Sequence, residues 1–534
     1  MKVKIKQWSM RVEAARSLDL AVLALCMALA IVVSVFHEPW RDEAQAWLLA
    51  RDLGPWQLVA SRLRYEGHTP LWYLLLMIPA KLGVPYEWGL KAVSLCVTAI
   101  AMFLLVRKSP FPWFVRYSLP FTYFLFYQYT VVSRSYCLIV LLMWLAALCF
   151  SRRNEKPWPY AAVLMALGAV SAHGILFGAG FALAWLLEIA AGEVRRGRGW
   201  LPRLLRDRRI HALLAYGGVL LCFAAMLWPP PDRYTNGLAK DYGGLLWVYM
   251  LLLAPLDGFI SDVGIRFTLG GSWTVGVAPA ILWVAALVVM FYYFRRKGLL
   301  WYGLLSYWPV TLFMAFVYFT IYHVGLYVVW LICLVWMCRT GPRAGVPFAA
   351  ALPGGLSRVW RFAAPVVYAA VLAVQLFWTV SICANDIRLP FESGRAVAQY
   401  IRQHNLEGRR VMEQYDFNKQ FGQVYTDQVV SVQPYFERNI FYNFNGGDPE
   451  RSYNTFTMPT GQEPEQWRAG GPPEFYLENF LHSIDDYPYI LNGDDYVQIA
   501  SFPYYRMWKT VAVPYTDVLY ARRDIAGEYL TPQN

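Results

Sequence analysis

The sequence predicts a polytopic α-helical membrane protein of about eleven spans that ends in a small α/β domain. First, 57% of the 534 residues are hydrophobic and only 16% are charged, and the apolar residues form many blocks long enough to cross a bilayer. Second, the charge is uneven: residues 1–383 hold 35 Lys and Arg against 16 Asp and Glu, whereas residues 384–534 hold 13 against 20. This pattern indicates a basic transmembrane domain, 1–383, followed by an acidic soluble domain, 384–534.

The chain begins with a basic leader, residues 1–16, that runs into an apolar segment over 18–36. This segment continues directly into His37-Glu38-Pro39 without a small-residue cleavage site, so we expect an anchor and not a removable signal. Because cytoplasmic loops are rich in Lys and Arg, the leader predicts a cytoplasmic N-terminus. The first loop, 37–87, is then expected on the outer side of the membrane.

A short apolar run over 70–83 follows within this loop. It has about 14 residues against the roughly 20 that a span needs. If it crossed the membrane together with the next run, Arg107 and Lys108 would be exported, against the usual placement of basic residues. We therefore expect a juxtamembrane or half-inserted helix here.

The same charge rule places the remaining spans. Each strongly basic segment, such as 193–208 and 295–297, then falls on the cytoplasmic side, and the C-terminal domain falls outside. A second half-inserted helix is expected within 245–256. The expected spans are 18–36, 88–106, 117–132, 135–150, 158–172, 174–191, 211–228, 274–293, 299–319, 324–338 and 363–383.

The acidic tail has the patterning of a soluble domain. Residues 393–408 place apolar side chains at helical spacing and end at a glycine. Residues 409–417, 494–502 and 517–524 have the composition or alternation of strands. The tail contains none of the eight cysteines, so it is expected to fold without disulfides.

The positive net charge does not indicate nucleic-acid binding, because the basic residues lie between apolar spans. The cysteines lie in or beside apolar segments without metal-ligand spacing, which is typical of small buried side chains.

An adjacent acid pair, Asp42 and Glu43, follows the first span closely. Acids beside a membrane are costly and are therefore candidates for function. A carboxylate at the outer mouth could take a proton from the hydroxyl of an acceptor. The alternative is that both are solvated loop charges, or that Asp42 caps a helix beginning at Glu43.

Glu66 and His68 precede the short apolar run. His68 could bind phosphate at the helix N-terminus, act as an acid, or with Glu66 hold a divalent ion, although two ligands at this spacing are a weak metal signal. The alternative is a hydrogen-bonded helix cap.

Arg134 separates two apolar runs and has Tyr136 beside it. An Arg at an outer helix end suits a phosphate, although its side chain could instead reach the interface without a ligand. His173, Tyr322 and His323 also fall at outer ends of spans, where each alone is more often an interfacial aromatic than a ligand. Their expected position on one side of the membrane is the stronger observation.

In their order, the segments DEAQAWLLARD, YEGHTPLWYLLL and VVSRSYCLIVLL resemble the GT-C superfamily of integral-membrane glycosyltransferases. The pattern is most similar to bacterial relatives of protein O-mannosyltransferases and to lipid A aminoarabinose transferases (glycosyltransferase family 39-like). The resemblance covers roughly residues 18–150. It implies that Asp42 is the catalytic acid with Glu43 as its neighbour, that His68-Thr69-Pro70-Leu71 replaces the family's (H/K)PPL element, and that Arg134-Ser135-Tyr136 is its Arg-x-Tyr element. Thr69 departs from the second proline that the family often has.

The resemblance implies an inverting transferase that uses a polyprenyl-phosphate sugar and acts on a lipid, glycan or protein hydroxyl at the outer face of the cytoplasmic membrane. Asp42 would be the base, and Arg134, His68, Tyr136 and His323 would bind the donor phosphate, with support from Glu66, His173 and Tyr322. No cofactor or essential metal is expected, because fixed cations can stabilise the leaving phosphate. Two alternatives are a flippase for a lipid-linked saccharide and a polysaccharide polymerase or ligase.

Overall fold

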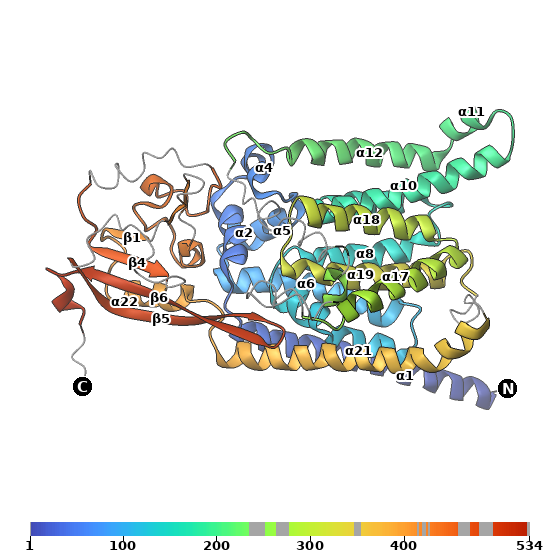
Figure 1. The fold of residues 1–534 in the computed structure, drawn as a ribbon, viewed down its shortest axis with the longest axis horizontal. Helices are drawn as coiled ribbons and strands as arrows, with labels where there is room; N and C mark the ends of the chain where they lie inside the picture. The colour runs from blue at the N-terminus through green and yellow to red at the C-terminus, as the bar shows by residue number, and fades with distance from the viewer. Residues whose placement is uncertain are drawn as a thin grey trace.

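The structure is a computed structural model that describes residues 2–233, 251, 253–262, 277–345, 354–413, 416–418, 423–425, 428–457, 470–479 and 495–530. It is mostly helical, with a bundle of roughly aligned helices and a small mixed β-sheet at one end of that bundle (Figure 1). The N-terminus and the connection between α10 (Ala172–Arg195) and α12 (Arg208–Met226) lie at the other end (Figure 1). The half-inserted helix expected within 245–256 lies largely outside the described residues.

Six helical segments in the described part of the chain are long and apolar enough to cross a membrane. Large apolar side chains on these helices are exposed: Leu221 is 72% exposed and Val380 is 68% exposed. Such exposure is expected of apolar side chains that face lipid. A multi-pass membrane protein accounts for both observations. The six segments are Arg16–Phe36 of α1 (Lys2–Phe36), α6 (Tyr86–Lys108), α10 (Ala172–Arg195), α12 (Arg208–Met226), Ile321–Thr340 formed by η5 (Ile321–Val324) and α19 (Gly325–Thr340), and Arg361–Arg388 of α21 (Gly354–Arg388).

The bundle contains further helices, most of which are shorter than these six segments. They are α8 (Tyr136–Phe150), α9 (Pro157–Gly168), α11 (Trp200–Leu205), α15 (Ala254–Asp257), α17 (Val277–Lys297) and α18 (Leu300–Phe316). The single span expected over 117–132 is wrong: the chain forms α7 (Trp113–Ser118), the 3-10 turn η2 (Leu119–Phe121) and the π-helix η3 (Phe124–Val131). Pro120 has no N–H to continue the α7 ladder, which explains the break.

The first loop is largely helical. It contains α2 (Arg41–Asp52), α3 (Pro55–Gln57), the π-turn η1 (Leu58–Arg62), α4 (Leu63–Glu66) and α5 (Leu71–Lys81). The short helix expected over 70–83 is present as α5. Gly67, with φ of 70°, ends α4 and reverses the chain just before His68. These short helices lie between the bundle and the sheet (Figure 1).

The C-terminal part holds α22 (Gly394–Gln403) and a four-stranded sheet of order β1-β4-β6-β5. Strands β1 (Val411–Glu413) and β4 (Phe475–Asn479) are parallel, whereas β6 (Val511–Arg522) is antiparallel to both β4 and β5 (Tyr496–Trp508). The helix expected over 393–408 and the strands expected over 494–502 and 517–524 are therefore confirmed. Strands β2 (Asp416–Asn418) and β3 (Gln423–Tyr425) form a separate pair.

The tip of the β5–β6 hairpin joins the sheet to the bundle. Lys509 has the left-handed φ of 54° that closes this turn, and its ammonium donates to the carbonyl oxygens of Asp257, at 2.8 Å, and Ser261. The neighbouring Trp508 packs edge-on against Tyr123 in the bundle. Helix α21 also continues past the expected boundary at 383 to Arg388. The two parts consequently share one contiguous apolar core.

Candidate active site

A small cavity of about 90 Å³ lies where the first loop, the bundle and the C-terminal part meet. Four of the residues singled out in the sequence, Asp42, Glu66, His68 and Arg134, line it together. The other lining residues are Gln45, Ala46, Trp72, Tyr73, Ser135, Tyr318 and Phe456. Segments far apart in the sequence therefore bring acids, a histidine and an arginine to one place.

Asp42 and Arg134 form the central ion pair. The Arg134 Nη1 atom is 2.6 Å from Asp42 Oδ2, and their side chains are 13% and 29% exposed. Asp42 stands in the first turn of α2, where the helix dipole favours a negative charge. Arg134 comes from the tight turn between η3 and α8, with Trp40 and Tyr136 rings about its guanidinium. Both side chains remain partly accessible, so a ligand can reach them.

Glu66 is already engaged by its neighbours. It accepts a hydrogen bond of 3.0 Å from Arg62 and one of 2.9 Å from the Gln45 amide. This carboxylate therefore orients the cavity wall and has less freedom than Asp42 to take a proton.

His68 lies in the turn after α4 with its Nδ1 atom 3.0 Å from the Glu66 carbonyl oxygen. A carbonyl only accepts, so Nδ1 carries the proton and Nε2 is left as an acceptor. Burial lowers the pKa of His68 from its usual value, against the pull of Glu66. The ring is therefore neutral at physiological pH and offers an acceptor.

Glu43 lies apart from the cavity although it is the neighbour of Asp42. Its fully buried carboxylate accepts from the Trp40 and Ser133 backbone N–H groups, at 3.1 and 2.6 Å, and contacts His37 Nε2 at 3.2 Å. His37 Nδ1 is 2.9 Å from Asp386 Oδ2. Glu43 thus caps α2 and ties it to α1, α21 and the turn that carries Arg134.

His323 and His173 stand behind the cavity wall. His323 Nδ1 accepts from the Thr320 N–H at 3.1 Å, so its Nε2–H donates to the Tyr136 hydroxyl oxygen at 2.9 Å. The His173 ring is 4.3 Å from that of His323. Among the described contacts, His323 is linked to the ion pair through Tyr136, whose ring lies beside Arg134.

Tyr322 makes packing contacts and does not line the cavity. Its carbonyl oxygen accepts from the Tyr129 hydroxyl at 2.9 Å, and its ring contacts those of Trp40 and Trp508. It therefore sits between the first loop and the tip of the β5–β6 hairpin.

Sequence reasoning missed a clamp from the C-terminal part. The Gln45 amide donates to the Asn454 carbonyl oxygen at 2.8 Å and accepts from the Asn454 N–H at 2.8 Å. Arg62 donates to the carbonyl oxygens of Asn454, at 2.6 Å, and Thr455. This clamp holds Phe456, which has the left-handed φ of 48°, against the cavity. The partners are 409 residues apart, and neither has a sequence signal of its own.

Within the described part of the chain, no three His, Cys, Asp or Glu side chains are grouped closely enough to hold a metal ion. The chain matches no protein-family model, and no curated protein sequence matches it.

Proposed function

We propose that the protein is an inverting GT-C-type glycosyltransferase that uses a polyprenyl-phosphate sugar donor. The observation that carries the proposal is the Asp42–Arg134 pair in a cavity between apolar helices and a polar cap. This pair combines the two groups that the reaction needs, a carboxylate for the proton and a guanidinium for the phosphate. The acceptor is a hydroxyl group of a lipid, glycan or protein.

In the proposed reaction Asp42 takes the proton of the acceptor hydroxyl. The acceptor oxygen then bonds to the anomeric carbon as the bond from that carbon to the phosphate oxygen breaks. The polyprenyl phosphate leaves with the bonding electron pair, and Arg134 stabilises the negative charge that develops on it. Inversion follows because the acceptor attacks on the side opposite the leaving phosphate.

The ion pair itself gives the donor a second role. Without a ligand, the guanidinium of Arg134 occupies the carboxylate of Asp42, so this carboxylate is not free to meet an acceptor hydroxyl. A donor phosphate competes for the guanidinium and releases Asp42 for the acceptor hydroxyl. Donor binding therefore prepares the base for reaction.

The neighbouring groups take supporting roles. The neutral His68, with its Nε2 acceptor, suits a sugar hydroxyl better than a phosphate. Tyr136, held by His323, orients the guanidinium of Arg134. Glu43 positions α2 and so acts on the reaction only through Asp42.

The cavity has to widen before a sugar can enter. Its volume of about 90 Å³ is well below the roughly 300–1,000 Å³ of ordinary small-molecule pockets. Phe456 forms one wall, and its segment is held by hydrogen bonds from Gln45 and Arg62 to Asn454 and Thr455 and by a β-bridge between Thr457 and Arg233. We infer that this segment moves away when the donor binds.

The proposed location is the outer face of the cytoplasmic membrane. Helix α11, which carries Arg203, lies at the end of the bundle opposite the sheet (Figure 1), and positive residues favour the cytoplasmic side. The cavity and the C-terminal part then face outward.

The test is Asp42→Asn in the purified full-length protein, with radiolabelled polyprenyl-phosphate hexoses and pentoses as donors and a membrane extract as acceptor. We expect transfer to fall at least about a hundredfold, the usual cost of losing a general base. Donor binding should persist, because Arg134 remains. The matched control is Asp524→Asn, an exposed acid that pairs with Arg522.

Unchanged transfer by the Asp42→Asn variant would refute the proposal. A flippase that uses the same cavity would move labelled donor lipid across a vesicle membrane without forming any glycosylated product.

A further inference from the structure

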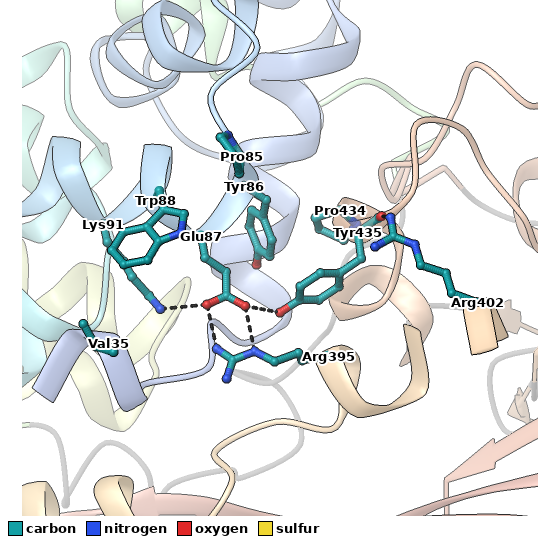
Figure 2. A pocket seen from close by; sticks show the side chains of 10 residues that line it. All are labelled: Val35, Pro85, Tyr86, Glu87, Trp88, Lys91, Arg395, Arg402, Pro434 and Tyr435. Atoms are coloured by element: carbon teal, nitrogen blue, oxygen red, sulfur yellow. Dashed lines mark hydrogen bonds and ion pairs between the residues drawn. The ribbon is translucent and has the colours of Figure 1, made fainter. Parts of the chain in front are cut away.

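A second and larger cavity lies on another side of the junction between the bundle and the C-terminal part. Its volume is about 510 Å³, and it shares no lining residue with the cavity of Asp42. Its walls come from the end of α1, the start of α6, helix α22 and the 3-10 turn η7 (Gln433–Tyr435) (Figure 2). The lining residues are Val35, Pro85, Tyr86, Glu87, Trp88, Lys91, Arg395, Arg402, Pro434 and Tyr435.

Positive charge predominates in this cavity, with three basic side chains to one acid. Glu87 accepts from Lys91 at 2.9 Å and from Arg395 at 2.9 and 2.6 Å, so two cations share one carboxylate (Figure 2). Arg402 is half exposed; it donates to the Tyr435 carbonyl oxygen, and among the described residues its acidic partner is the exposed Glu407 at 3.6 Å. Of the neighbouring acids outside the lining, Glu407 is exposed and Glu38 accepts from the backbone N–H of Arg395 at 2.6 Å. The side chains that line the cavity itself therefore carry an excess of positive charge that suits an anion.

One buried hydrogen-bond donor in the cavity has no partner. Tyr86 is only 6% exposed, and its buried hydroxyl makes no hydrogen bond within the described structure. It points toward Tyr435 and the Glu87 carboxylate, and its ring is 5.4 Å from that of Tyr435 (Figure 2). An unpaired buried hydroxyl costs free energy unless a ligand or water accepts from it.

The rim of the cavity is apolar. Val35 in the last turn of α1 is 46% exposed, and Trp88 in the first turn of α6 is 63% exposed. Both helices are long enough to cross a membrane, so these two residues mark the level at which each span meets the headgroups. The cavity consequently opens where a lipid presents its phosphate.

We propose that this cavity binds the phosphate headgroup of an anionic membrane lipid. Arg395, Lys91 and Arg402 supply the positive charge, and the hydroxyl of Tyr86 donates to a phosphate oxygen. The acyl chains lie against Val35 and Trp88. Because the walls come from both parts of the chain, the bound lipid holds the C-terminal part against the bundle. This proposal does not depend on the chemistry at Asp42.

The test is lipid binding by the full-length protein carrying Tyr86→Phe together with Arg402→Gln. The protein is reconstituted in neutral phosphatidylcholine with added phosphatidylglycerol, and native mass spectrometry counts the phosphatidylglycerol that is retained. We expect wild type to prefer phosphatidylglycerol, and the double variant to bind it at least roughly tenfold more weakly, since one hydrogen bond to a charged group is worth about that factor.

The matched control is Tyr160→Phe with Arg451→Gln. Tyr160 has an equally buried hydroxyl without a partner within the described structure, and Arg451 is an exposed arginine that does not line the cavity. These changes should leave lipid retention unchanged. Thermal unfolding in phosphatidylcholine alone shows whether each variant folds, and the single Tyr86→Phe variant carries the test if the double variant does not.

A parallel arm replaces the lipid with inorganic phosphate. Thermal stabilisation by phosphatidylglycerol but not by inorganic phosphate supports a lipid headgroup. Equal stabilisation by free phosphate would overturn the lipid assignment, as would equal retention of phosphatidylglycerol by wild type and the Tyr86 variants.

Discussion

Replacing His37 with glutamine tests the buried network that positions α2. His37 Nδ1 is 2.9 Å from Asp386 Oδ2 and Nε2 is 3.2 Å from Glu43 Oε2, with all three side chains fully buried. Burial alone would lower the pKa of His37, but the charges of Asp386 and Glu43 together raise it to about 10. The ring is therefore a cation between two acids, and it ties α1 to α2 and α21.

The size of the effect follows from this geometry. Removing one partner of a buried ion pair costs about 3–5 kcal/mol, because a charge is left buried without compensation. A glutamine can keep one hydrogen bond worth about 1 kcal/mol. We therefore expect His37→Gln to lower the free energy of unfolding by about 3 kcal/mol near neutral pH.

The loss should also depend on pH. Folding raises the pKa of His37 above its ordinary value of 6.5. The bound proton therefore contributes its full stabilisation at any pH below 6.5, the pKa of the unfolded chain. This stabilisation disappears as the pH rises through about 10. The difference in stability between wild type and His37→Gln should therefore shrink over this range.

The assay is thermal unfolding in detergent, followed by tryptophan fluorescence at several pH values. His404→Gln is the control, since this histidine is partly exposed and bonds only to the Tyr400 carbonyl oxygen among the contacts described. The double variant His37→Gln with Asp386→Asn should regain part of the stability, because one uncompensated charge is gone. This reasoning would be refuted if the His37→Gln variant unfolded at the same temperature as wild type at neutral pH. It would also be refuted if the difference in stability between the two proteins stayed constant up to about pH 10.

Two further predictions concern contacts between the bundle and the C-terminal part. Gln45→Ala removes two hydrogen bonds to Asn454, each worth about 1 kcal/mol, and should raise amide exchange at Asn454 roughly thirtyfold; unchanged protection would show that the amide does not hold this segment. Lys509→Met keeps the length of the side chain but removes its hydrogen bonds to the carbonyl oxygens of Asp257 and Ser261, at a cost of about 2–4 kcal/mol. It should lower the thermal midpoint and speed proteolysis of the β5–β6 hairpin, and a variant as resistant as wild type would show that the tip does not anchor the sheet.

Much of the helical fold was accessible from the sequence because it depends on local properties. Runs of apolar residues predict long helices, and the short run at 70–83 predicts the separate helix α5. The segment 117–132 was not predicted correctly, because its apolar composition concealed the break at Pro120 and the π-turns that follow. Hydropathy reports burial, whereas the continuity of a helix depends on individual backbone hydrogen bonds.

The candidate site was predicted in part for the same reason. Asp42, Glu66, His68 and Arg134 stood out because polar groups beside apolar runs are costly and rare. Which of the two adjacent acids faces the cavity could not be predicted. Successive residues on a helix point in different directions, and packing against His37 and Ser133 turns Glu43 inward.

The sequence by itself determined that the chain is apolar and helical and that a part with helical and strand patterns follows the apolar segments, and it marked the charged residues that need an explanation. The sequence also predicted that Asp42 and Arg134 belong to one site. Only the tertiary structure showed that these two side chains form a direct ion pair, that Asn454 is hydrogen-bonded to Gln45, and that Glu87 binds both Lys91 and Arg395 at a second cavity. The physical reason is the range of each interaction. Hydrophobic periodicity acts over one or two turns of a helix, whereas an ion pair or a hydrogen bond forms between any two groups that the packed fold places within a few ångströms.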